Sequence, residues 1–343
     1  MKSVRILLVL PCCIGDVILA TAGLRALRRA YPDARIAWAV GSWSKAAVEH
    51  HPDLDAVLDC GAAALPMKSP GGMARFVRML RAERADLLVS WVRSPWMSVA
   101  ALLSGIPVRA GIDSAGRGFG YTVRAGIDPE AALHEAEIYL DVVRALGIDT
   151  AGCLANVPVL DADREAMRAR LKAASISPDC VVVHPGGGRN PGMTLDAKRY
   201  PPEQLAALAD QIAARRRAGV VLIGAPNDAP LVELVAARLT APHAAFTDLT
   251  FGQIAALAAE SALYVGNDTG MTHLAAAVGA RTAAIFGPTD PRRYAPFGKA
   301  VRVLWRPVEV GARGVAGGAP AAWDWARDGI SVEACLTALA DWL

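Results

Sequence analysis

The sequence has no cysteine motif typical of a metal site and only a small net charge, and each of these absences excludes a class of protein. The six cysteines form no C-x-x-C pair and no closely spaced Cys/His set, so no metal site is expected and the thiols should be reduced and mostly buried. The net charge is only +3, from 36 Lys+Arg and 33 Asp+Glu, which is too small for wholesale wrapping of nucleic acid. No nucleic-acid partner is therefore expected, and any anion must be recognised locally.

Export and membrane signals are also lacking. No small-residue cleavage site follows the apolar run near the N-terminus, so no signal peptide is predicted. Apolar stretches such as residues 94–108 are short and interrupted by Pro and Gly, whereas a bilayer span needs about 20 apolar residues. We expect a cytoplasmic protein, with contact with a membrane left open.

Length and composition indicate two globular domains. The 343 residues are too many for one ordinary core, and a hydrophobic content of 53% with 20% charged residues excludes disorder. Short aliphatic runs repeatedly lead through a Gly- or Pro-marked turn into a segment of helical period. This alternation predicts an α/β fold of two doubly wound, Rossmann-like domains.

The elements expected in the first half are strands 4–10, 35–40, 56–59 and 87–91 and helices 17–30, 44–50, 73–83 and 131–146. Residues 105–129 read as a Gly- and Arg-rich loop of the kind that carries binding. The second half is expected to contain strands 180–183, 220–223, 263–265 and 282–286 and helices 202–215, 229–239, 253–260, 271–278 and 332–343.

The Pro-flanked stretch 151–160 marks the expected domain boundary, because the alternation restarts after it. Residues 1–155 would form an N-terminal domain and residues 156–329 a C-terminal domain, each Rossmann-like. The C-terminal helix, in residues 330–343, is a candidate to pack back on the first domain. Ligands of such domains bind at the carboxyl ends of the strands.

Several familiar motifs are absent. The sequence has no G-x-x-x-x-G-K-[ST] phosphate loop, and the glycines at 116–120 do not follow an expected strand as a dinucleotide fingerprint would. It also has no Asp-x-Asp pair at a strand end. The charge of a phosphate leaving group would therefore be neutralised by lysine, backbone amides and a helix dipole rather than by a metal.

Asp16 follows the first strand and lies near a helix N-terminus, at the edge where a ligand would bind. A carboxylate there is suited to take a proton from a hydroxyl that attacks a sugar carbon. The alternative is that Asp16 only caps the helix.

The second candidate segment is the glycine cluster after strand 180–183, which includes Gly186 and Gly187, together with Lys198. Glycines let a ligand approach the backbone, and a lysine offers a point charge to a phosphate. A plain turn is the alternative for the glycines. His184 is either a ligand contact or a structural residue.

The third segment, residues 263–273, contains a strand, a Gly-Asn-Asp-Thr-Gly turn and a helix start. Free backbone N–H groups and the helix dipole favour an anion there, so Thr269 and Gly270 are expected to hold a diphosphate. Asp268 either accepts hydrogen bonds from sugar hydroxyls or caps the helix. His273 either donates to phosphate or packs beneath the loop.

Weaker candidates complete the set. Asn227 and Asp228 follow strand 220–223 and suit a ribose, while Arg117 and Arg124 lie in or beside the long loop and are candidates for an acidic acceptor. A helix face carries arginines that suit either an anionic lipid or solvent, namely Arg75, Arg78, Arg81 and Arg84.

Taken together, the chain resembles the heptosyltransferase family. The resemblance spans nearly the whole chain and depends on Ile14-Gly-Asp16, His134-Glu135, His184-Pro-Gly186, Lys198-Arg-Tyr-Pro201, Gly266-Asn-Asp-Thr-Gly270 with His273, and Phe286-Gly-Pro-Thr-Asp290.

The resemblance implies a metal-independent glycosyltransferase of the GT-B type, with its two domains facing a central crevice. It implies inverting transfer of heptose from the donor ADP-heptose, with no further cofactor, to an acidic glycolipid of the lipopolysaccharide inner core. Carried over by position, Asp16 is the general base, Lys198 contacts the diphosphate, Asp268 contacts the sugar, and Asn227 or Asp228 binds the ribose.

This chain departs from the family at Cys12 and Cys13, where serine or arginine is common, and at Thr21-Ala22, where Thr-Pro is common. The departures lie on the acceptor side. Two alternatives are therefore kept: a related transferase with another acceptor, such as a small metabolite, and a non-catalytic nucleotide-sugar binding protein.

Overall fold

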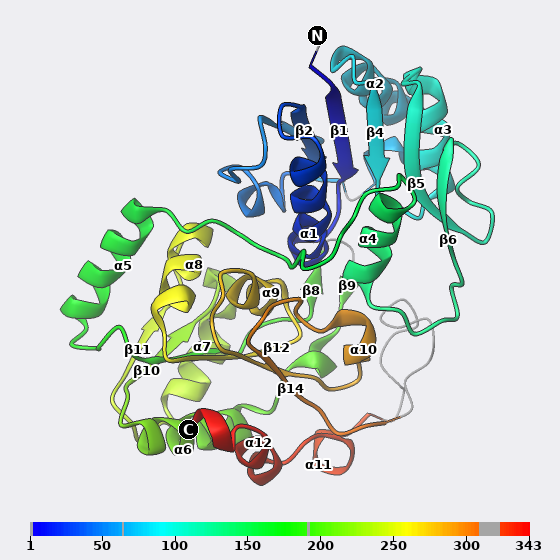
Figure 1. Cartoon of the computed structure of the whole chain (residues 1–343). Helices are drawn as coiled ribbons and strands as arrows, with labels where there is room; N and C mark the ends of the chain where they lie inside the picture. The colour runs from blue at the N-terminus through cyan, green and yellow to red at the C-terminus, as the bar shows by residue number, and fades with distance from the viewer. Residues whose placement is uncertain (1–2, 64, 191–192, 309–322) are drawn as a thin grey trace. The chain divides into compact units, whose positions relative to one another are not determined.

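The structure, a computed structural model, describes residues 3–63, 65–190, 193–308 and 323–343 (Figure 1). The chain divides between Val157 and Pro158 into two units, beside the Pro-flanked stretch that the sequence marks. Each unit is built on a six-stranded sheet in which every strand pair is parallel.

In the first unit the strand order is β3-β2-β1-β4-β5-β6. Its strands are β1 Arg5–Leu10, β2 Arg35–Val40, β3 Ala56–Asp59, β4 Leu87–Ser90, β5 Val108–Ser114 and β6 Val123–Ile127. Its helices are α1 Ile14–Ala30, α2 Pro70–Ala82, α3 Pro95–Ser104 and α4 Glu135–Arg144, with 3-10 turns η1 Lys45–Ala47 and η2 Pro66–Lys68.

Right-handed crossovers place α1 on one face of this sheet and α2 and α3 on the other. The contacts agree, because α1 packs on α4 while α2 packs on α3. The ring of Trp91 reaches α1 at Gly23, where a Cβ atom would lie 2.7 Å from the ring. Its indole N–H donates to the Tyr139 carbonyl at 2.9 Å, which ties the end of β4 to α4.

The second unit has the strand order β11-β10-β7-β12-β13-β14. Its strands are β7 Val181–His184, β10 Val220–Ile223, β11 His243–Phe246, β12 Leu263–Asn267, β13 Thr282–Ile285 and β14 Val301–Leu304, with a separate hairpin of β8 Arg189–Asn190 and β9 Met193–Thr194. Its helices are α5 Asp161–Ala173, α6 Pro202–Arg216, α7 Ala229–Ala236, α8 Phe251–Glu260, α9 Gly270–Ala277, α10 Pro291–Tyr294, α11 Trp325–Asp328 and α12 Val332–Ala338, with 3-10 turns η3 Asp196–Lys198, η4 Pro226–Asp228 and η6 Ala340–Trp342.

When the strands of each six-stranded sheet are numbered from one to six in chain order, both sheets have the same spatial order, 3-2-1-4-5-6. The order reverses between β1 and β4 in the first sheet and between β7 and β12 in the second. Such a switch point is where open α/β sheets bind their ligands. The prediction of two doubly wound α/β units is confirmed, and the strand order defines the edge of each sheet where a ligand is expected.

The predicted loop 105–129 is wrong in part, because it contains β5 and β6. Gly111 and Gly120 serve packing: a Cβ atom on Gly111 would lie 2.4 Å from the Tyr121 ring, and one on Gly120 would lie 2.0 Å from the Ser98 carbonyl oxygen. Other elements were also missed, namely α3, α10, α11, β11, β14 and the β8–β9 hairpin, whereas the helix expected over 44–50 is only the 3-10 turn η1.

The C-terminal segment packs on the second unit. Cys335, Leu336 and Leu339 join the hydrophobic core beneath α6, and α12 contacts α6 and β14. The sequence had made this helix a candidate to cover the first domain. An apolar stripe shows that a helix is covered but does not identify the covering surface.

Candidate active site

Asp16 lies in the first turn of α1, directly after β1 and therefore at the switch point of the first sheet. The helix starts at Ile14 with Cys13 as its N-cap residue, earlier than the predicted start at Val17. Asp16 is consequently not the N-cap. The capping alternative therefore loses its basis at that position, and the half-buried carboxylate is placed at the ligand-binding edge.

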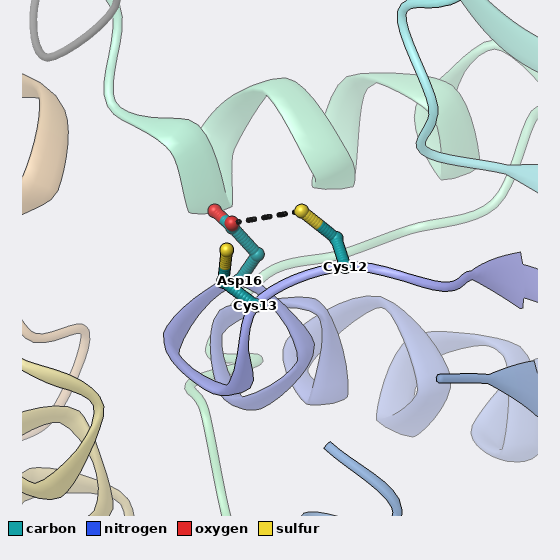
Figure 2. A group of neighbouring side chains, drawn as sticks. All are labelled: Cys12, Cys13 and Asp16. Atoms are coloured by element: carbon teal, nitrogen blue, oxygen red, sulfur yellow. Dashed lines mark hydrogen bonds between the residues drawn. The ribbon is translucent and has the colours of Figure 1, made fainter. Parts of the chain in front are cut away.

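Two side chains donate hydrogen bonds to this carboxylate. The Tyr139 hydroxyl donates to Asp16 Oδ1 at 3.1 Å, and the Cys12 thiol donates to Asp16 Oδ2 at 3.4 Å (Figure 2). Burial, together with the charges of Asp16 and Glu135, raises the pKa of Tyr139 well above its usual range. Tyr139 therefore remains a neutral phenol that can donate.

Arg93 and Glu135 form an ion pair in the same unit, with 2.7 Å between Arg93 Nη2 and Glu135 Oε2. Burial alone would lower the pKa of Arg93, but the charge of Glu135, its hydrogen bond with Arg93 and the charge of Asp16 outweigh burial and raise the pKa. The sequence signalled Glu135 through His134-Glu135 and gave no sign of Arg93. Arg93 follows β4 by a few residues, so only the strand order brings it to the switch point.

Cys12, Cys13 and Asp16 form a compact group of side chains. Their sulfur and oxygen atoms all lie within 4.8 Å of one another. The hydrogen bond with Cys13, burial and the charge of Asp16 raise the pKa of Cys12 well above its usual range. The sequence contains no C-x-x-C pair and no Cys/His set with metal-ligand spacing, and this group has a different spacing, a Cys-Cys pair with a carboxylate one helical turn later.

In the second unit, Lys198 and Asp268 form a buried ion pair at the switch point of the sheet. Lys198 Nζ lies 2.6 Å from Asp268 Oδ2, and the Thr289 hydroxyl donates to the same oxygen at 2.8 Å. Thr269, not Asp268, is the N-cap residue of α9 and accepts from the Thr272 amide. Asp268 is therefore not the helix cap.

Asn267 connects three of the predicted segments, although the sequence assigned it no role. Its amide Nδ2 donates to the carbonyls of Pro185 and Gly186 at 2.9 and 3.0 Å, and its Oδ1 accepts from the Tyr200 amide at 3.0 Å. The side chain is fully buried. It thereby holds the glycine cluster, the Lys198 segment and the Asn-Asp-Thr-Gly turn together.

The glycine cluster fits closely against other parts of this site. A Cβ atom on Gly186 would lie 2.8 Å from Asp228 Oδ2 and 2.9 Å from His184 Nε2. Gly187 has φ +128°, and a Cβ atom there would lie 2.3 Å from the Thr269 methyl carbon. Gly187 is thus required by the chain's own packing, whereas a side chain at Gly186 would need the ends of the Asp228 and His184 side chains to shift.

The two histidines of the predicted site are buried. His184 ends β7, with Nδ1 3.4 Å from the Thr269 hydroxyl, and burial lowers its pKa to about 4. His273 lies within α9 and is 7% exposed. Gly270 is the first residue of α9, so its amide belongs to the positive end of the helix.

Asn227 and Asp228 lie in η4, directly after β10, at the same edge of the sheet. Asn227 is exposed, while Asp228 is half-buried and accepts from the Ala225 amide at 3.3 Å. The structure therefore brings the candidates of the second unit together at the carboxyl ends of β7, β10 and β12.

Arg117 and Arg124 lie apart from Asp16 in the strand order. Arg117 is exposed in the connection after β5, and Arg124 lies in the edge strand β6. The Arg124 guanidinium is 3.8 Å from Asp113 and donates to the Tyr121 carbonyl. Arg124 is thus partly engaged within its own unit.

Among the residues that the structure describes, no helix is long and apolar enough to cross a membrane.

The matching family model and similar curated proteins point to one family. The family model described as glycosyltransferase family 9 (heptosyltransferase) matches residues 73–313. Lipopolysaccharide heptosyltransferase 3 of Escherichia coli is 24% identical over 299 residues, which are 85% of this chain and 86% of that protein.

Two solved structures share the fold over nearly the whole chain. A glycosyl transferase family 9 protein from Veillonella parvula DSM 2008 has a TM-score of 0.80 at 21% identity, covering 98% of this chain and 96% of its own. The E. coli ADP-heptose lps heptosyltransferase II has a TM-score of 0.74 at 22% identity and 98% coverage of both chains. These likenesses confirm the predicted GT-B fold class.

Proposed function

This chain belongs to glycosyltransferase family 9, the heptosyltransferase family, and we propose that it transfers heptose from ADP-heptose to a hydroxyl of the lipopolysaccharide inner core, with inversion at the anomeric carbon. In this reaction the acceptor oxygen bonds to the anomeric carbon as the bond from that carbon to the diphosphate breaks. The acceptor proton passes to a base, and ADP leaves.

The observation that carries the proposal is the buried Lys198–Asp268 pair beside the N-terminus of α9. An ammonium has three N–H donors, and the bond to Asp268 uses one of them. We assign the others to the departing diphosphate, with the amides of Thr269 and Gly270 and the dipole of α9 adding positive potential. The leaving group would then be stabilised without a metal or any further cofactor.

The remaining donor contacts follow from the same edge of the sheet. Asp268 Oδ2 accepts from both Lys198 and Thr289, so we assign Oδ1 to a sugar hydroxyl. Asn227 or Asp228 would hold the ribose, and the backbone of the glycine cluster would line the path of the diphosphate. His273 would support the turn from within α9. The E. coli structure named for ADP-heptose supports this choice of donor.

On the acceptor side we assign Asp16 as the general base. Its carboxylate is half-buried and receives the Tyr139 hydroxyl on Oδ1, which orients it. Arg117 and Arg124 would attract the acid sugars of a glycolipid. Since such an acceptor is anchored in lipid, transfer would take place at the cytoplasmic face of the inner membrane.

The test follows ADP release by the purified chain with ADP-heptose and a heptose-free lipid A that carries acid sugars, without added metal. Wild type should release ADP only with the acceptor, and Asp16→Asn should lower the rate by about 10²–10⁴-fold, the usual contribution of a general base. Asp59→Asn is the matched control, since Asp59 also ends a strand of this unit but binds Ser42 and Gly61. NMR of the product should give the inverted anomeric configuration.

The other outcomes distinguish the alternatives. Release of ADP with a small acceptor but not with the glycolipid would overturn the lipopolysaccharide assignment and keep the transferase. Donor binding with no release on any acceptor would indicate a nucleotide-sugar binding protein. Full activity of Asp16→Asn would assign the base to another residue.

A further inference from the structure

Two thiols flank the proposed base, and the transfer reaction uses neither. Cys13 is the N-cap residue of α1 and Cys12 directly precedes it, so both thiols lie within one helical turn of Asp16. Both are half-buried, as is Asp16. Figure 2 shows the two sulfur atoms and the carboxylate gathered at the start of α1.

The spacing of these atoms fits a tetrahedral metal site. In such a site, with Zn–S distances of about 2.3 Å and Zn–O distances of about 2.1 Å, a sulfur and an oxygen lie about 3.6 Å apart and two sulfurs about 3.8 Å apart. Here Cys12 Sγ lies 3.4 Å from Asp16 Oδ2, and all three donor atoms lie within 4.8 Å of one another. Small side-chain rotations would therefore bring them to ligand distances.

The chemistry of the donors selects the kind of metal. Two thiolates favour a soft or borderline cation such as Zn²⁺ over Mg²⁺ or Ca²⁺, which prefer oxygen. The carboxylate supplies a third ligand, and a tetrahedral ion would keep its fourth position for water. The Tyr139 hydroxyl, 3.1 Å from Asp16 Oδ1, would orient the ligating carboxylate as an outer-shell partner.

We propose that Cys12, Cys13 and Asp16 form a binding site for a thiophilic divalent cation, with Zn²⁺ as its physiological representative, and that the bound ion inhibits transfer. Binding forms two S–Zn bonds and one O–Zn bond and releases the thiol protons to solvent. The inhibition rests on the proposed function of Asp16, because a carboxylate that ligates Zn²⁺ cannot take the acceptor proton. The binding itself does not depend on that function.

The experiment titrates the reduced, chelator-treated full chain with Co²⁺, a spectroscopic substitute for Zn²⁺. Sulfur-to-cobalt charge-transfer absorption should appear and weaken in both Cys12→Ser and Cys13→Ser. Cys60→Ser is the matched control, since Cys60 is also a half-buried thiol of this unit, and it should keep the full absorption. Circular dichroism of each variant verifies that it folds.

Zn²⁺ affinity is measured by competition with a chromophoric chelator. Each serine variant should bind at least about tenfold more weakly, because loss of an outer-shell partner alone costs that much. Zn²⁺ should also inhibit ADP release by the wild type, and Cys12→Ser should resist the inhibition at the same concentration.

Absence of charge-transfer absorption in the wild type, or equal absorption in wild type and both serine variants, would overturn the site. Binding that leaves ADP release unchanged at saturation would keep the site and overturn the inhibition. The metal-free rate of Asp16→Asn reports separately on the proposed function, so the two proposals fail in distinguishable ways.

Discussion

Lys198 Nζ lies 2.6 Å from Asp268 Oδ2, with 9% of one side chain and 5% of the other exposed. The two residues are 70 positions apart in the chain. Burying each of these charges costs desolvation free energy, and the attraction between the two charges compensates that cost. Removal of either partner would therefore leave an isolated buried charge. The pair therefore supports both the fold of the second unit and its proposed binding of a diphosphate.

We predict that Lys198→Met lowers the free energy of unfolding by about 3–5 kcal/mol, the usual cost of leaving one buried charge unpaired. Urea denaturation measures the loss. The control is Lys45→Met, whose exposed pair with Glu49 spans 3.8 Å and should contribute less than about 1 kcal/mol. The double variant Lys198→Met, Asp268→Leu should recover part of the loss. Equal stability of Lys198→Met and wild type would contradict the role of the pair.

Gly187→Ala should destabilise the second unit for two separable reasons. Its φ of +128° disfavours any side chain, and its Cβ would lie 2.3 Å from the Thr269 methyl carbon. Gly279→Ala, at φ +87° with no described atom within 4 Å of its Cβ, should cost only the backbone strain of about 1–2 kcal/mol.

Overpacking should add about 1–3 kcal/mol to the cost of Gly187→Ala. Adding Thr269→Ser removes the methyl group and keeps the hydroxyl that caps α9, so it should recover the added part. Thermal and urea unfolding of the single and double variants test this. No recovery in the double variant would mean that backbone strain alone sets the cost.

The pH dependence of stability should contain a contribution from His184. Burial and then Arg199 lower its pKa, against the opposing effect of Asp228, from 6.5 to about 4. The unfolded chain therefore binds more protons between these two pKa values, so the contribution is complete above pH 6.5 and is lost as pH falls toward 4.

Between neutral pH and pH 4 the wild type should lose about 3 kcal/mol more stability than His184→Gln. Urea midpoints across this range provide the measurement. His243→Gln, which changes an exposed histidine, should keep the wild-type dependence. Parallel curves for wild type and His184→Gln would show that His184 titrates normally in the folded protein.

Tyr139→Phe should lower kcat about tenfold and leave KM for the donor unchanged. The substitution removes one hydrogen bond to the Asp16 carboxylate. Hydrogen bonds to charged groups contribute about 1.5–3 kcal/mol, and about 1.4 kcal/mol corresponds to a factor of ten in rate. Tyr121→Phe is the control, since that hydroxyl contacts the Val92 carbonyl at 3.5 Å. A change in KM alone would show that Tyr139 acts in binding rather than in positioning the base.

Local patterns in the sequence predicted much of the fold. The aliphatic runs at β2, β3 and β10 give the observed bounds, and the Asn-Asp-Thr-Gly segment joins the end of β12 to the start of α9 as expected. These features depend on neighbours only a few residues away. The missed strands β5 and β6 differ, because Gly111 in β5 and Gly120 in the connection to β6 are explained by contacts with Tyr121 and Ser98 that no local pattern contains.

The sequence by itself determined the alternation of strands and helices, the two-unit organisation and the identity of most residues at the candidate site. Only the tertiary structure decided how those residues meet: Lys198 against Asp268, Tyr139 against Asp16, and Asn267 between three segments. The sequence also could not decide that α12 covers the core of the second unit. Periodicity and turn chemistry act through adjacent residues, whereas strand order and packing join residues far apart in the chain, and those long-range contacts give the site its geometry.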